Sequence, residues 1–158
     1  MEIDVLVAYT QYALSSVGTR QQMTDLVNLA FAETNGAYAA SGVNVIINLV
    51  YLHEDTSGYN IDQTDTSSMS PSLSALRSTT DGNLDYIHQM RIDYGADMVA
   101  LITAGAGCGI AYLNSGYSTM FSVTRYDCAT GYYSFGHELG MLYKSLLLFS
   151  SFFLLILI

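Results

Sequence analysis

The fold of this 158-residue chain is constrained most by three apolar runs rich in β-branched residues. Long segments of helical character separate these runs. The runs cover residues 3–10, 43–52 and 96–103. Residues 19–41 carry apolar side chains at intervals of three and four, which predicts a helix with Thr19 as its N-cap. Residues 72–94 predict a second helix, interrupted at residues 81–82. The run at 43–52 is typical of a central strand buried on both faces. The alternation of predicted strands and helices along the chain predicts a mainly parallel sheet.

Shorter elements are predicted in the remainder of the chain. Residues 53–71 are polar and rich in turn-forming residues, so we expect a surface loop. After a glycine-rich turn, two short strands are predicted at 110–113 and 120–126, followed by a helix that begins near residue 133. The whole order of elements predicts an α/β fold with a mainly parallel sheet and one antiparallel edge strand.

The composition changes abruptly after Gly140. All 14 acidic residues and four of the five basic residues lie in residues 1–140, whereas residues 141–158 contain 14 apolar residues out of 18 and one charge, Lys144. We therefore divide the chain into a body, residues 1–140, and an apolar tail, residues 141–158. The net charge of −9 repels phosphate backbones, so we expect no nucleic-acid partner. No basic segment with an apolar core precedes the first strand, so we expect no signal peptide in this sequence.

His137 and Glu138 begin the only local sequence with the character of a catalytic motif. In the pattern H-E-x-x-H, helical spacing puts two imidazoles on one helix face as zinc ligands, and the intervening glutamate acts as general base. The chain reads His-Glu-Leu-Gly at residues 137–140. Taken alone, this pair also fits an ordinary pair of surface residues on a helix.

Several further segments accompany this motif in a fixed order. They are residues 3–10, 39–43, 81–88 (with Asp81, Gly82, Asp85 and His88), 94–99, 108–113, 121–123, 128–129 and 134–140. Together they resemble the metzincin clan of zinc metalloendopeptidases, in particular its reprolysin-like and bacterial peptidyl-Asp members, over about residues 2–140. The resemblance implies the metzincin-like N-terminal subdomain: a mostly parallel, five-stranded twisted sheet with one antiparallel edge strand and three helices.

The resemblance also implies roles for individual residues. His137 matches the first zinc ligand, and Glu138 matches the general base that activates the attacking water. The edge strand is implied to bind an extended polypeptide substrate, and an open sheet edge offers main-chain hydrogen bonds for that purpose. The substrate-binding residues so implied are Ile110, Ala111, Tyr112 and Leu113. Their sequence by itself fits an ordinary short edge strand equally well.

Cys108 and Cys128 match a disulfide pair of the family. From the residues alone, two buried free thiols fit as well. A disulfide and the family together imply an extracellular, secreted protein, and the family implies zinc as cofactor.

The zinc motif of the family does not continue in this chain. Its pattern, H-E-x-x-H-x-x-G-x-x-H/D, requires ligands at 141 and 147 and glycine at 144, where the chain has Met141, Leu147 and Lys144. Zinc takes imidazole, thiolate or carboxylate ligands and needs at least three from the protein. We therefore expect that the chain as written does not hold zinc and is inactive. The alternative function is a non-catalytic peptide-binding or membrane-attached module of the same fold.

The other two histidines are not expected to replace the missing ligands. His53 is predicted in a solvated loop beside acidic residues, and His88 is predicted on the second helix as a packed or surface residue. Neither has ligand spacing to His137.

Three explanations fit the tail at residues 141–158. It is the product of a broken reading frame within a truncated peptidase domain, a membrane anchor, or a buried helix of a non-catalytic relative. Its uninterrupted part, residues 146–158, is shorter than the roughly 20 residues of a bilayer span. We favour the broken frame, because the ligands are lost and the composition changes at the same residue.

Overall fold

The predicted sheet is present in the computed structural model of the chain, which describes residues 1–64, 67–113 and 116–142. Its five strands have the order β2-β1-β3-β5-β4. They are β1 (Glu2–Tyr9), β2 (Ile46–Glu54), β3 (Met98–Thr103), β4 (Gly109–Ala111) and β5 (Phe121–Arg125). Every neighbouring pair is parallel except β4 and β5, which confirms the α/β class and the antiparallel edge strand.

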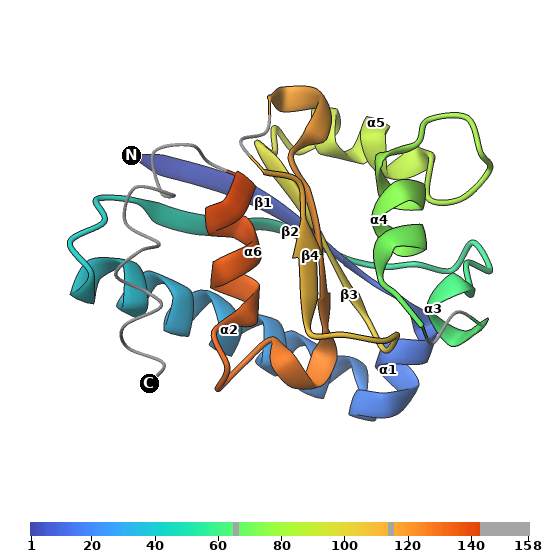
Figure 1. The fold of residues 1–158 in the computed structure, drawn as a ribbon, viewed down its shortest axis with the longest axis horizontal. Helices are drawn as coiled ribbons and strands as arrows, with labels where there is room; N and C mark the ends of the chain where they lie inside the picture. The colour runs from blue at the N-terminus through green and yellow to red at the C-terminus, as the bar shows by residue number, and fades with distance from the viewer. Residues whose placement is uncertain (65–66, 114–115, 143–158) are drawn as a thin grey trace.

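Helices cover both faces of the sheet (Figure 1). The described residues form six α-helices, which corrects the expected three. They are α1 (Gln11–Val17), α2 (Arg20–Ala40), α3 (Ile61–Thr64), α4 (Ser70–Arg77), α5 (Tyr86–Asp93) and α6 (Ser134–Leu142). Two short 3-10 turns, η1 (Tyr117–Thr119) and η2 (Tyr126–Cys128), flank β5.

The additional helices have local causes. Helix α1 is capped by Thr10, whose Oγ1 accepts a hydrogen bond from the Ala13 amide at 3.0 Å. Its seven residues are too few to show a clear helical period. The predicted helix at 72–94 is divided into α4 and α5. Between them Gly82 and Leu84 adopt positive φ angles of 81° and 60°, which a helix does not accommodate. Thr19 is the N-cap of helix α2, as predicted, and forms a capping box with Gln22.

Two apolar cores lie on opposite sides of the sheet, because successive residues of a strand point to opposite faces. Val5 and Val7 of β1 pack with residues of α1, α2 and α6. Leu6 and Ala8 pack with residues of α4 and α5 on the other side. Helix α6 therefore shares a face with α2, and α4 covers the opposite face (Figure 1).

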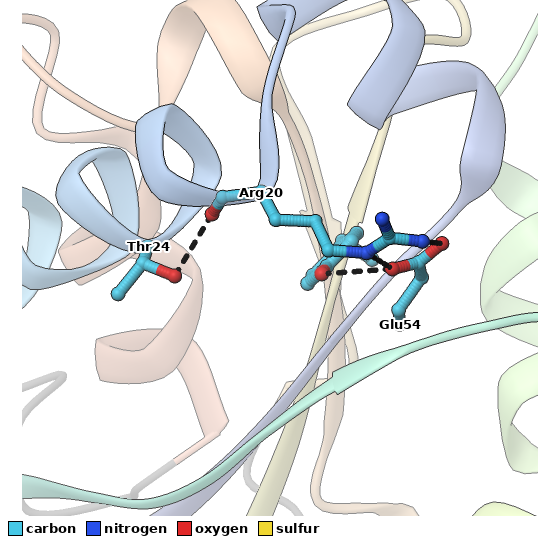
Figure 2. Close-up of polar contacts among 4 residues, drawn as sticks. Arg20, Thr24 and Glu54 are labelled. Carbon is cyan, nitrogen blue, oxygen red and sulfur yellow. Dashed lines mark hydrogen bonds and ion pairs between the residues drawn. The ribbon is translucent and has the colours of Figure 1, made fainter.

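Strand β2 lies at a sheet edge, which corrects the prediction of a central strand buried on both faces. Among the described strands it pairs with β1 alone, and most of its side chains are half-buried. Asn35 of α2 covers its outer main chain at Ile47, since the carboxamide donates to the carbonyl at 3.0 Å and accepts from the amide at 2.9 Å. Arg20 at the start of α2 binds Glu54 at the end of β2, as Figure 2 shows. This edge is thus partly closed by α2.

The predictions for Lys144, Leu147 and the rest of the tail after residue 142 lie outside the described residues. In the described ranges, no helix has the length and apolar character needed to cross a membrane.

Candidate active site

Helix α6 carries the His-Glu pair, and close packing against α2 sets its position. A Cβ atom at Gly136 would lie 2.8 Å from both Cγ2 and Oγ1 of Thr34, so glycine is needed where the two helices meet. The Tyr38 hydroxyl donates a hydrogen bond of 2.7 Å to the Gly136 carbonyl, and the Phe31 and Phe135 rings pack with their centroids 5.2 Å apart. These contacts fix which way the next two residues of α6 point.

His137 and Glu138 point in different directions from this helix. His137 is exposed to solvent, whereas Glu138 is only 9% exposed and faces the edge strand β4. A Cβ atom at Gly109 would lie 2.5 Å from Glu138 Oε1 and 2.6 Å from its Cγ. The carboxylate therefore rests directly against the main chain of β4, in space that only glycine leaves free.

Burial also changes the acidity of Glu138. Loss of solvation raises the pKa of its carboxyl group from the ordinary 4.5 to about 7. Among the described residues, none forms a hydrogen bond or ion pair that would offset this loss of solvation. A carboxyl group with this pKa exchanges its proton near neutral pH, as a general base must.

The main chain of β4 has a defined open side. The Arg125 amide donates to the Cys108 carbonyl at 2.9 Å, and Ile110 pairs with Val123. Since hydrogen-bonded pairs alternate in an antiparallel ladder, Ile110 directs its amide and carbonyl toward β5, and Gly109 and Ala111 direct theirs outward. Sequence reasoning missed Gly109, although its position directly after Cys108 in the resembling segment could have drawn attention to it.

The four residues predicted to bind substrate are only partly within the strand. Ile110 and Ala111 belong to β4, and Tyr112 and Leu113 directly follow it. Leu113 is 61% exposed. No strand of the described residues pairs with the outer side of β4.

The disulfide implied by the resemblance is present between Cys108 and Cys128. It joins the residue before β4 to the end of η2, in the segment that leads into α6. The same segment is held to α2, because the Gly131 amide donates to Glu33 Oε2 at 2.8 Å. The disulfide thus links the segments that lead into β4 and α6, the two elements that hold Gly109 and Glu138.

The described residues do not fit the zinc ion that the resemblance implies. His137 is followed one helical turn later by Met141, whose thioether is not a zinc ligand. Both cysteines are in the disulfide, and no group of three His, Cys, Asp or Glu residues in the described part of the chain could hold a metal.

The remaining histidines do not supply the missing ligands. His53 lies in β2 rather than in a solvated loop, and its Nε2 is 3.2 Å from the Tyr86 hydroxyl. His88 lies on α5, and the centroid of its ring is 5.1 Å from that of the Phe121 ring. The structure thus brings Glu138 and the edge strand together, whereas His137 is exposed and the full ligand set is not assembled among the described residues.

Comparisons with known proteins identify the family. The model of the metallo-peptidase family M12B, reprolysin-like, matches residues 24–142. A peptidyl-Asp metalloendopeptidase of Stenotrophomonas maltophilia is 40% identical over 142 residues, and one of Xanthomonas campestris is 38% identical. Each alignment covers 89% of this chain and 32% of the relative, so the chain spans about a third of the length of these relatives.

A solved structure shares the fold. It is described as the structure of a chaperone-substrate complex and aligns with a TM-score of 0.69 and 17% identity, over 89% of this chain and 25% of the other. At this identity the likeness concerns the fold alone. The match of the family model over most of the chain, together with relatives near 40% identity, shows that the chain belongs to the reprolysin-like M12B family of metallopeptidases.

Proposed function

We propose that the chain contributes the peptide-binding edge and the general base of a metalloendopeptidase domain. The observation that carries this proposal is the contact of the buried Glu138 carboxylate with Gly109, whose amide and carbonyl point to the open side of β4. A polypeptide bound in extended form would pair with the outward main-chain groups of Gly109 and Ala111. The name of the relatives supports peptides that contain aspartate as the substrate class of the whole protein.

Glu138 would act on the peptide from the face of the sheet that α6 covers. Its carboxylate would accept a proton from the attacking water, a role to which its raised pKa is suited. Peptide backbone held at β4 would bring a carbonyl group to this carboxylate. Zinc has no part in this scheme, because Met141 stands at the position of the second ligand.

The chain as written is proposed to be inactive in peptide-bond hydrolysis, since neither Met141 nor Leu147 coordinates zinc. A non-catalytic peptide-binding module is the second candidate, and the same open edge would serve it. We also propose an extracellular location, because disulfides such as Cys108–Cys128 persist in oxidising compartments.

Zinc content and proteolysis of the purified chain test this proposal. We expect zinc far below one equivalent and no cleavage of an unfolded fluorescent protein substrate, together with binding of extended peptides. Glu138→Gln serves as the matched control for cleavage. Near-stoichiometric zinc with chelator-sensitive cleavage that is lost in Glu138→Gln would contradict the proposed inactivity. Absence of any peptide binding would contradict the peptide-binding edge.

A further inference from the structure

We propose that Arg77 is a specificity-determining residue that binds the carboxylate of an acidic side chain in a peptide held at β4. This inference rests on the proposed peptide-binding function of that edge.

Arginine is scarce in this chain, and three of the four arginines in the described residues have fixed partners. Arg20 holds Glu54 through two guanidinium nitrogens (Figure 2), and Arg125 forms an ion pair with Asp127. Arg91 is buried and donates to main-chain carbonyl groups, among them that of Tyr117 at 2.7 Å. None of these guanidinium groups is available to a ligand.

Arg77 differs from these three. It is the exposed last residue of α4, and no residue in the described ranges forms a hydrogen bond or ion pair with it. Its guanidinium carbon lies 5.3 Å from the centroid of the Tyr112 ring. Tyr112 directly follows β4, so this positive charge stands at the end of the proposed peptide-binding strand.

The packing of α4 holds Arg77 in this place. The preceding residues Leu73 and Leu76 are buried in the core that also contains Phe121 and Val123 of β5. The half-buried Tyr112 ring contacts both cores, and the Arg77 guanidinium lies over the face of this ring. The side chain is thus oriented before any ligand arrives, which reduces the entropy lost on binding.

Successive side chains of a bound peptide strand would point to opposite faces of the sheet, and Arg77 lies on the α4 face. Ile110 packs toward the α4 side of the sheet, whereas Glu138 lies on the α6 side. A peptide strand beside β4 would likewise direct alternate side chains to the α4 face. A carboxylate on that face next to Tyr112 would meet the guanidinium, which binds carboxylates through two parallel hydrogen bonds. Because the chain has a net charge of −9, an acidic peptide needs such a local positive group.

The inference is tested by measuring how short extended peptides bind to the full chain. Both ends of each peptide are blocked. Each peptide is neutral apart from one aspartate, moved through every position in turn, and is compared with its asparagine counterpart by fluorescence anisotropy. We expect the aspartate peptide to bind about threefold to tenfold more tightly at one position. Arg77→Gln should reduce this ratio to about one, and Arg77→Glu should prefer a lysine at the same position.

Arg20→Gln is the matched control, because it removes the same charge from an exposed arginine that is bound to Glu54. This variant should keep the preference for aspartate. Equal binding of aspartate and asparagine peptides at every position, or a preference that survives in Arg77→Gln, would overturn the inference and leave the peptide-binding edge intact. Failure of every peptide to bind would overturn both the inference and the proposed function on which it rests.

Discussion

At the scale of single residues, the site depends on a missing side chain at Gly109. The Glu138 carboxylate occupies the space that a methyl group there would fill. This contact positions a buried carboxylate beside main-chain groups that pair with no strand of the described residues. The two residues are 29 positions apart, and neither sequence neighbourhood indicates the contact.

Substitution of Gly109 by alanine should therefore displace Glu138. The added Cβ would lie 2.5 Å from Oε1, and overpacking of this kind costs about 1–3 kcal/mol of unfolding free energy. Urea unfolding of Gly109→Ala, Glu138→Ala and the double variant measures the coupling. In the double variant the alanine at 109 has room, so its cost should largely disappear. An equal cost in both backgrounds would show that the contact does not limit the size of residue 109.

Burial of Glu138 should make stability depend on pH. The folded state has a pKa of about 7 for this group against 4.5 in the unfolded state, so the folded state binds the proton more tightly. The unfolding free energy should then fall as pH rises from about 4.5 to 7 and change little from this cause above pH 7. The effect is no larger than about 3–4 kcal/mol, since one pKa unit corresponds to about 1.4 kcal/mol.

The variant Glu138→Gln provides the comparison for this pH effect. Its stability should lack this decrease, so the difference between the variant and the original chain should grow from pH 4.5 to 7 in thermal or urea unfolding. Parallel pH profiles of the two proteins would contradict a raised pKa at Glu138.

At the scale of elements, the contact between α2 and α6 places the His-Glu pair. Gly136 touches Thr34, and Tyr38 holds the Gly136 carbonyl. Helix α2 was predicted from its period and its cap at Thr19, and both are present. Its role in closing the β2 edge and in placing α6 was not predictable, because it depends on contacts between distant segments.

Two glycine-to-alanine substitutions distinguish the effect of close helix packing on stability from the effect of helix propensity. Gly136→Ala should destabilise the protein by about 1–3 kcal/mol, since its Cβ would lie 2.8 Å from Thr34. Gly36→Ala in α2 meets no atom within 4 Å and should stabilise the protein by about 0.5–1 kcal/mol through helix propensity. Chemical denaturation measures both. Similar changes of the same sign in the two variants would contradict close packing at Gly136.

At the scale of the whole molecule, the acidic body gives way to the apolar tail at the same position where the zinc motif is lost. The family match extends to residue 142, and the chain covers about a third of its relatives. We propose that the body and the tail meet at residue 140, and that a broken reading frame produced the tail at residues 141–158.

The nucleotide sequence after codon 140 tests this proposal at the scale of the gene. Translation in the two other frames should give H-x-x-G-x-x-H or H-x-x-G-x-x-D, continuing the motif from His137 and Glu138. If neither frame contains such a continuation, the broken-frame explanation is wrong, and the anchor and core-helix explanations remain.

The sequence by itself determined the α/β class, the alternation of strands and helices, the helix cap at Thr19 and, through family resemblance, the His137–Glu138 pair and the disulfide. These features depend on residue patterns over short distances or on motifs in a fixed order. Only the tertiary structure decided that β2 lies at an edge, that Gly109 receives Glu138, and that Arg77 lies on Tyr112. Each of these depends on how distant elements pack, and local periodicity carries no information about which strands become neighbours or which side chains meet across a helix and a sheet.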